Sequence, residues 1–262
     1  VIYSFPDIKV HSKILYIEKR TEGTVRRYGY IATGNFNEKT ATLYTDFGLM
    51  TAKKKITKDL NQVFLVLEQK LLVPKTKKIL VSPYTTRIGF SELVQNEIAI
   101  AQSGKPASII LKMNSLEDQD MIQQLYRASN AGVKIRLLIR GICCLIPGIK
   151  GQSENITITS VVDRFLEHGR VYIFGNNNEE RIFIGSADWM TRNLNHRIEV
   201  VTPILDKDHK NTIRELIEVQ LNDTVKARFI DAHQKNEYVS QTYKQVQSQL
   251  ATYAYCKRMI EK

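Results

Sequence analysis

The amino-acid sequence predicts an α/β protein in which mixed, mostly parallel sheets are flanked by helices. Apolar strand-like segments alternate with helical segments from residue 79 onward, which is typical of a sheet covered on both faces. A hairpin pattern occupies the N-terminal region. The chain has 262 residues, of which 43% are hydrophobic and 25% charged, so it can bury a large core without disulfides.

The N-terminal elements are two strands and a tight turn. Val10–Ile17 and Thr24–Ala32 are rich in Val, Ile and Tyr, as strands usually are. The segment between them, Arg20–Gly23, is polar and contains a glycine. We therefore expect an antiparallel hairpin.

A helix and a change of pattern follow the hairpin. Apolar residues recur at helical spacing from Ile56 to Leu72, and Pro74 stops the helix. The next residues, Lys75–Lys78, form a basic, polar joint. We place a boundary there and predict two domains, residues 1–76 and 77–262.

The second region reads as strands alternating with helices. Its predicted strands are Ile79–Ser82, Ala107–Lys112, Val133–Ile139, Val171–Phe174, Ile182–Ile184 and Ile198–Val201. Its predicted helices are Phe90–Gln102, a helix capped by Ser115 and ended by Gly132, Asp208–Leu221 and Tyr243–Ile260. Ligands bind at the carboxyl ends of strands in such sheets, and several of these ends carry small polar residues and cations that suit phosphate.

Composition narrows the partners and the compartment. The net charge of +11 favours a polyanion. Three cysteines, two of them adjacent, are poor material for a disulfide framework, which suits the reducing cytoplasm. No apolar run is long enough to span a bilayer, although the basic charge leaves peripheral membrane association open. Val1 opens the chain without a helix start or linker, as expected of a fragment.

The strongest local motif is His11 with Lys13. If both lie on one strand, alternation places them on the same face. A neutral imidazole can attack phosphorus, and a nearby ammonium group can take up charge on a phosphoryl oxygen. Thr33-Gly34-Asn35 ends the next predicted strand and can supply a backbone donor and an amide. The motif alone also fits a strand histidine that is hydrogen-bonded to a neighbour.

A second histidine pattern echoes the first. His168 is followed by Arg170 and then by Gly185–Asp188. The two copies resemble the paired motifs of the phospholipase D superfamily, where two histidines face each other across a phosphate. Arg170 stands where that superfamily has lysine, and Glu18 stands where it has aspartate in the first copy. These departures, with a longer spacing from histidine to glycine, argue against phosphodiester hydrolysis.

Longer strings identify a family. The strings are Val10–Lys13, Thr33–Ala41, Leu43–Asp46, Arg140–Leu145, Gly185–Asn193 and Asp223–Arg228. Together they resemble polyphosphate kinases, in the family's order and over essentially the whole chain. The resemblance is to the C-terminal catalytic region, so the family's two N-terminal domains and the start of its first catalytic domain would be missing. By itself the chain is expected to make little polyphosphate.

The resemblance implies an activity and a site. It implies reversible transfer of the ATP γ-phosphate to inorganic polyphosphate through a phosphohistidine at His11, with His168 as a second essential residue. It places Tyr44, Arg140 and His168 at the nucleotide. Further candidates for ATP or phosphate binding are Arg197, Lys13, Asn35, Arg192 and Ser186. Lys112 is another candidate cation.

The resemblance also implies a cofactor and partners. Mg²⁺ is expected to arrive with ATP, and the family's magnesium-linked arginines would lie upstream of Val1, so no metal ligand is assigned in this chain. ATP, ADP and polyphosphate are the expected partners, and nucleic acid is not. The complete protein is expected to be a cytoplasmic homo-oligomer.

Two other functions fit parts of the sequence. A phospholipase D-like phosphodiesterase or nuclease would use the same pair of histidines and would also suit a basic surface. It would cleave a phosphodiester without ATP. A non-enzymatic polyanion-binding module would interleave basic and aromatic residues along one face, whereas the cations of this chain gather at strand ends.

Overall fold

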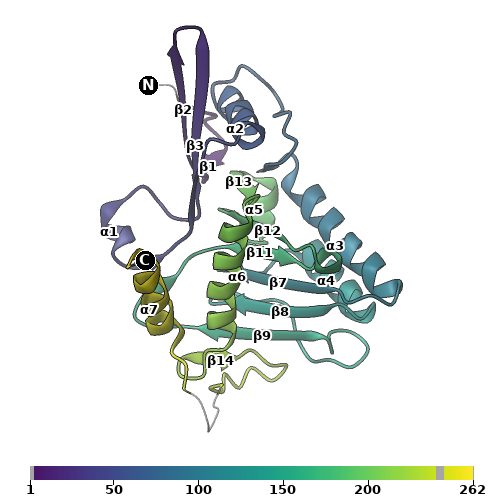
Figure 1. The fold of residues 1–262 in the computed structure, drawn as a ribbon. Coiled ribbons are helices and arrows are strands. Elements are labelled where there is room, and N and C mark those ends of the chain that lie inside the picture. The colour runs from purple at the N-terminus through teal and green to yellow at the C-terminus, as the bar shows by residue number, and fades with distance from the viewer. Residues whose placement is uncertain (1–2, 240–244, 262) are drawn as a thin grey trace.

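The computed structural model describes residues 3–239 and 245–261, and it shows a hairpin-bearing part joined to a large sheet (Figure 1). The elements up to residue 67 are β1 (Lys9–Val10), β2 (Lys13–Thr21), β3 (Thr24–Ala32), α1 (Glu38–Ala41), β4 (Tyr44–Thr45), β5 (Gly48–Thr51) and α2 (Lys54–Leu67). The remaining strands are β6 (Leu80–Ser82), β7 (Ser108–Met113), β8 (Lys134–Ile139), β9 (Ile156–Val161), β10 (Leu166–Glu167), β11 (Val171–Phe174), β12 (Arg181–Gly185), β13 (Arg197–Pro203) and β14 (Ala227–Phe229). The remaining helices are α3 (Thr86–Gln102), α4 (Gln119–Asn130), the 3₁₀ turn η1 (Asn176–Asn178), α5 (Thr191–Asn195), α6 (Lys207–Leu221) and α7 (Ser248–Ile260).

The hairpin is present where the sequence predicts it. Strands β2 and β3 pair along their whole length, and β5 pairs with β3 on the other side. The turn residues Glu22 and Gly23 have φ values of 47° and 77°. Positive φ at both central positions is what a two-residue hairpin turn requires, so the glycine signal is confirmed.

The predicted strand Val10–Ile17 is interrupted between β1 and β2. This corrects one expectation. Strand β1 belongs to the large sheet, where it runs parallel to β13. The backbone N–H groups of His11 and Ser12 both donate to the carbonyl of Ile198, at 2.9 and 3.0 Å. His11 is therefore not on a strand with Lys13, and strand alternation does not place them on one face. The interruption arises because the chain passes here from the large sheet into the hairpin.

The large sheet is mixed, which confirms the α/β class. Its strand order is β1-β13-β12-β11-β7-β8-β9-β14, and β6 also pairs with β13. The adjacent strands β7, β8 and β9 are parallel. The pairs β11 with β7, β11 with β12, β12 with β13, β6 with β13 and β14 with β9 are antiparallel. Within the described residues antiparallel pairs therefore outnumber parallel ones, and the expectation of a mostly parallel sheet is wrong because hairpin-like connections join β11, β12 and β13.

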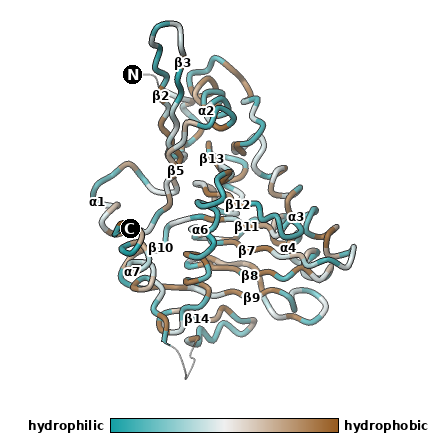
Figure 2. The backbone as a smooth tube through the Cα atoms, in the orientation of Figure 1, coloured by the Kyte–Doolittle hydropathy of each residue, from teal (hydrophilic) through white to brown (hydrophobic). Residues whose placement is uncertain are grey.

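Helices cover both faces of this sheet (Figure 1). On β7, Ile109 and Leu111 belong to the core beneath α3 and α4, whereas Ile110 belongs to the core that includes Ile213 and Ile217 of α6. The alternation follows from the two-residue period of a strand. Figure 2 shows hydrophobic residues along β7 and β8 and hydrophilic residues on much of α6. The sheet therefore has a hydrophobic core on each of its two faces.

Helix α2 joins the hairpin to the large sheet. Ile56 and Leu60 of α2 share a buried core with Ile31 of β3 and Val200 of β13. The helix ends at Leu67 rather than at Leu72. The chain leaves it because Gln69 adopts a positive φ of 58°. Since the two parts share a core and a sheet, the boundary at residues 76 and 77 stays a prediction.

Two other helices differ from their predictions. Helix α4 is capped by Asp118, whose side chain accepts from the N–H of Met121 at 3.1 Å, and not by Ser115. The chain before it stays extended because Leu116 bridges to Cys143 and Trp189. Helix α7 begins at Ser248, and the first predicted residues, Tyr243 and Lys244, lie outside the described residues. Within the described ranges, no helix combines the length and apolar character needed to cross a membrane.

Candidate active site

His11 is held by a buried carboxylate from the far half of the chain. Its Nδ1 lies 2.9 Å from each carboxylate oxygen of Glu199 on β13. Glu199 is fully buried, and Asn193 of α5 donates a hydrogen bond of 2.6 Å to it. A buried carboxylate at this distance requires a proton on Nδ1, so the lone pair of the neutral ring lies on Nε2. The His11 side chain is 22% exposed.

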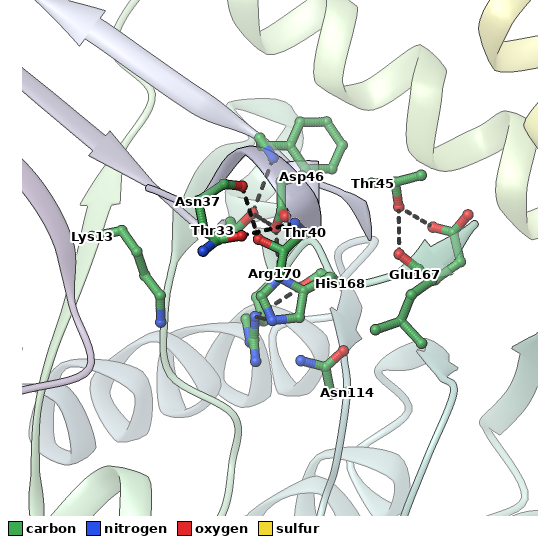
Figure 3. Close-up of polar contacts among 12 residues, drawn as sticks. Lys13, Thr33, Asn37, Thr40, Thr45, Asp46, Asn114, Glu167, His168 and Arg170 are labelled. Atoms are coloured by element: carbon green, nitrogen blue, oxygen red, sulfur yellow. Dashed lines mark hydrogen bonds and ion pairs between the residues drawn. The ribbon is translucent and has the colours of Figure 1, made fainter. Parts of the chain in front are cut away.

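His168 is likewise bonded to a carboxylate, which belongs to the N-terminal part of the chain. It follows β10, which pairs with β4, and its Nδ1 lies 2.8 Å from Oδ1 of Asp46 (Figure 3). The hydroxyl of Thr33 donates to the same oxygen at 2.5 Å. Gly34 lies so close to Asp46 that an added Cβ would overlap the carboxylate. The Thr33-Gly34 motif therefore positions the partner of His168.

Arg170 distinguishes the two histidines. Its Nη1 lies 3.2 Å from Nε2 of His168 and donates to the carbonyl of His168 at 2.8 Å. Its Nε and Nη2 donate to the two carboxylate oxygens of Asp188, at 3.3 and 3.1 Å. Because Nδ1 of His168 faces Asp46, Nε2 is the acceptor for Arg170. In the part of the chain that the structure describes, no such partner lies on Nε2 of His11.

Burial and charge set the protonation of His168. Burial lowers its pKa, the hydrogen bond to Asp46 raises it, and the positive charges of Arg170 and Lys13 lower it further. The net effect is a pKa below the ordinary histidine value. The ring is therefore mainly neutral at pH 7.

Each histidine is bonded to a carboxylate from the other part of the chain, where the two parts are residues 1–76 and 77–262. His11 lies before residue 76 and takes Glu199 from beyond it, whereas His168 lies beyond residue 77 and takes Asp46 from before it. Neither histidine is oriented by a carboxylate of its own half.

Lys13 experiences the electrostatic field of both centres. It is 6% exposed, and its ammonium group donates to the carbonyl of His11 at 2.5 Å. Burial is the main cause that lowers its pKa to about 8. The negative charges of Glu199 and Asp46 raise this pKa, and the positive charges of Arg170 and Arg197 lower it. The partner carboxylates of both histidines, Glu199 and Asp46, act on this one ammonium group, and so does Arg170. The two histidine centres therefore belong to a single charged region.

Arg140 reaches the His168 centre through the backbone. Its Nε donates to the carbonyl of Glu167 at 2.7 Å. Burial and the nearby charge of Arg170 lower its pKa, although carboxylates oppose this. Lys112, a candidate phosphate ligand, is instead paired with the buried Glu167 carboxylate at 2.7 Å. Its charge is already neutralised, so the expectation that it serves phosphate finds no support in this geometry.

The other candidates differ in their placement. The ring of Tyr44 lies 5.0 Å from that of His168. Arg197 opens β13 beside Lys9 and acts on the pKa of Lys13. Ser186 is buried. Its backbone N–H donates to the carbonyl of Val200 on β13 at 3.1 Å, and its hydroxyl oxygen accepts from the N–H of Val200 at 3.2 Å.

Two candidates lie at the periphery. Asn35 and Arg192 are exposed, and among the described residues no hydrogen bond or ion pair joins their side chains to the two histidines. Tyr44, Arg140, Arg197 and Lys13 therefore gather around the histidines, while Asn35 and Arg192 do not contact them.

Sequence reasoning missed Asp46 and Glu199 as site residues. A signal was available for Glu199, because a carboxylate inside the apolar segment Ile198–Val201 needs a buried partner. Glu18, taken as the counterpart of the superfamily aspartate, instead pairs with Arg20 and Arg27 on the hairpin. The position in sequence was misleading because the carboxylates bonded to the histidines come from elsewhere, Asp46 from the segment after β4 and Glu199 from β13.

The described residues do not fit a magnesium site. No group of three or more His, Cys, Asp or Glu side chains within 3–239 and 245–261 is arranged to hold a metal ion. The two carboxylates at the centre are occupied, Asp46 by Thr33 and His168 and Glu199 by His11 and Asn193.

Comparisons with known proteins identify the family. Residues 1–73 match the family model "Polyphosphate kinase C-terminal domain 1", and residues 79–249 match "Polyphosphate kinase C-terminal domain 2". The chain is 48% identical to the polyphosphate kinase of Vibrio parahaemolyticus and 46% identical to that of Escherichia coli, over 99% of its length. It spans 37% and 38% of those two proteins.

A solved structure matches over the same extent. The crystal structure of polyphosphate kinase from Porphyromonas gingivalis superposes with a TM-score of 0.94 and 41% sequence identity. The match covers 99% of this chain and 40% of that chain. The chain therefore belongs to the polyphosphate kinase family and matches its two C-terminal domains.

Proposed function

We propose that this chain carries the phosphoryl-transfer centre of a polyphosphate kinase, with His11 as the nucleophile. The observation that supports the choice is the difference between the two rings. Glu199 holds Nδ1 of His11, and Nε2 remains the atom with a lone pair for phosphorus. The corresponding Nε2 of His168 faces Arg170.

The proposed reaction has two displacements. Nε2 of His11 attacks the γ-phosphorus of ATP, a P–N bond forms, and the bond from phosphorus to the β–γ bridging oxygen breaks. ADP leaves with that electron pair. A terminal oxygen of polyphosphate then attacks the same phosphorus, and the P–N bond breaks. The reverse sequence makes ATP.

Glu199 assists because it is buried and negative. The imidazole becomes positively charged when Nε2 bonds to phosphorus, and the proton stays on Nδ1. A buried carboxylate fixed at 2.9 Å stabilises this charge. The group need not reorganise during the step, which is why such preoriented charges accelerate reactions.

We propose that His168 acts as a base at the transferring phosphoryl group and becomes a hydrogen-bond donor to a phosphoryl oxygen only once its Nε2 has taken up a proton. Its lowered pKa leaves it mainly neutral at pH 7, which makes it a poor proton donor at the start of the reaction. Lys13, Arg140 and Arg170 supply positive charge around the phosphoryl oxygens, as phosphoryl transfer requires.

The remaining binding assignments are also proposals. We place Tyr44, Arg140 and His168 at the nucleotide and Arg197 at phosphate. Asn35, Arg192 and Ser186 stay predictions with weaker geometric support. Mg²⁺ bound with ATP would bridge its phosphates, and no step above passes through it. A cytoplasmic homo-oligomer is the form that the family resemblance favours, and light scattering of the protein expressed from its complete gene would test the assembly.

Phosphate labelling tests the nucleophile. The protein expressed from its complete gene is incubated with ATP labelled in the γ-phosphate and with Mg²⁺. We expect an acid-labile, base-stable phosphate on His11 that His11→Ala removes. His209→Ala, on the exposed surface of α6, is the matched control and should label normally. Retention of the label in His11→Ala would exclude the assignment.

A further inference from the structure

Two basic runs that are separate in the sequence meet in one concave surface. We call this surface the basic groove and define its cations as Arg27, Lys55, Lys58, Lys75, Lys77 and Lys78. It has a volume of about 660 Å³ and lies between β3, α2 and the segment that follows α2. The lysines before and after α2 converge because the chain turns back along the helix.

The groove keeps its shape through Asp59, a lining carboxylate that is bonded to backbone N–H groups. Oδ2 of Asp59 accepts hydrogen bonds from the backbone N–H groups of Lys77, Lys78 and Ile79, at 2.8, 2.5 and 3.1 Å. Asp59 is 5% exposed. These bonds fix the segment 77–79 against α2 while the lysine side chains remain exposed.

The positive charge of the groove is largely uncompensated. Arg27 is paired with Glu18 at 2.9 Å. Among the described residues, none of the five groove lysines makes an ion pair within 4.0 Å. Five ammonium groups around one concavity repel one another, and this repulsion is relieved by an anion that contacts several of them at once.

The lining favours an anion without bases or acyl chains. Its other members are Asp59, Asn61 and Gln62, and no aromatic side chain lines the groove. Single-stranded nucleic acid is held by aromatic rings on which bases stack, and membrane-binding surfaces insert apolar side chains. The groove lining offers neither feature.

We propose that the basic groove binds the body of an inorganic polyphosphate chain, at a distance from the reacting phosphate. The proposal rests on the proposed function. Strand β3 continues from Arg27 to Ala32, and the next residue, Thr33, is bonded to Asp46, the partner of His168. Six extended residues therefore separate the groove from the active centre by roughly 20 Å. A long polymer can occupy both places, whereas a short one cannot.

The groove would then act as an anchor. A chain held by several lysines keeps its free end near His11 after each transfer, which raises the local concentration of that end. Removing the anchor should weaken binding of long chains and leave the chemistry at His11 unchanged.

The test uses two triple variants that each remove three positive charges. The groove variant is Lys55→Ala, Lys58→Ala and Lys77→Ala. The control is Lys105→Ala, Lys150→Ala and Lys207→Ala, all exposed lysines outside the groove. Alanine is favourable in helices, and thermal unfolding of both variants checks the fold. Fluorescent long-chain polyphosphate is titrated onto the protein expressed from its complete gene at several salt concentrations.

We expect the groove variant to lose about tenfold or more in affinity for long-chain polyphosphate. Its slope of log affinity against log salt should fall by about 2, because fewer counterions are released. Affinity for tripolyphosphate and phosphate labelling of His11 should be unchanged. The control variant should change much less.

Other outcomes would overturn the proposal. Equal losses in both triple variants would show a general charge effect. Because Leu72 and Val73 are exposed just before the groove, anionic vesicles and single-stranded RNA are tested in parallel. If only their binding falls in the groove variant, the groove serves another partner. If wild-type protein fails to label His11 but still binds polyphosphate through the groove, the proposed function fails and the groove assignment stands.

Discussion

Nδ1 of His11 and the carboxylate of Glu199 lie 2.9 Å apart although 188 positions separate them in the sequence. Glu199 itself has no exposure to solvent. The contact fixes the tautomer of the ring and leaves the lone pair on Nε2. The structure thus connects the edge of the large sheet directly to the proposed nucleophile.

Glu199→Gln should slow phosphorylation of His11 by roughly 10²- to 10⁴-fold, because the amide keeps the shape and removes the charge. Rapid-quench measurement of labelled phosphohistidine gives the rate. Glu237→Gln, an exposed carboxylate on the far side of the sheet, is the control. Urea unfolding must show that the buried amide has not disrupted the fold. A wild-type labelling rate in Glu199→Gln would contradict the assigned role.

Labelling of His11 should weaken as pH rises above about 8, because Lys13 has a pKa of about 8 and loses its charge there. The second-order rate of labelling at low ATP reports the free protein. Lys13→Arg should remove the decline, since arginine stays charged, whereas Lys9→Arg on the exposed β1 should not. A decline that persists in Lys13→Arg would assign it to another group.

The same shift has a consequence for stability. The folded pKa of Lys13 is depressed below the unfolded value of about 10.4. Between pH 8 and that value the unfolded chain binds more protons, so this residue makes the free energy of unfolding increase with pH. In Lys13→Met this contribution should vanish, as urea titrations across the window will show. An unchanged pH dependence would contradict the depressed pKa.

Lys112→Met should destabilise the protein by about 3–5 kcal/mol, because it leaves the buried Glu167 carboxylate without its cation. The double variant Lys112→Met, Glu167→Leu should recover part of this loss, since it removes the isolated charge. Urea unfolding measures both, and Lys105→Met at an exposed position is the control. If the single variant is as stable as wild type, the pair contributes little.

Gln249→Ala should loosen the segment that carries His168. The Gln249 amide donates to the carbonyl of Phe165 at 2.8 Å and to Glu167 at 2.8 Å, and it accepts from the N–H of Phe165 at 2.9 Å. Losing these bonds should cost about 1–3 kcal/mol locally. Hydrogen exchange of amides 165–169 should accelerate, with Gln245→Ala as the exposed control. Unchanged exchange would show that α7 does not hold this segment.

Local patterns in the sequence predict most of the fold. The hairpin follows from β-branched and aromatic residues with a glycine turn, and Gly23 takes the positive φ expected of it. The helices around Phe90 and Ile213 follow from apolar periodicity. Strand β9 was not among the predicted strands, although its alternating Ile and Thr residues carried the signal.

The site is less accessible to such reasoning. His11 and His168 are identifiable from motifs, but their carboxylates depend on which strands meet. The pairs β1 with β13 and β10 with β4 involve only two residues of β1 and of β10. Periodicity within one segment does not encode so short a contact between distant segments. Asp46 and Glu199 therefore become visible only in three dimensions.

The exchange of carboxylates between the halves also bears on how the protein is made. Translation delivers His11 long before Glu199, so a nascent chain holds an imidazole with no anion to orient it. Asp46 likewise lacks its partner until His168 has been synthesised. If the proposed function holds, a polypeptide that ends before Glu199 should not react with ATP, because His11 would lack its carboxylate partner.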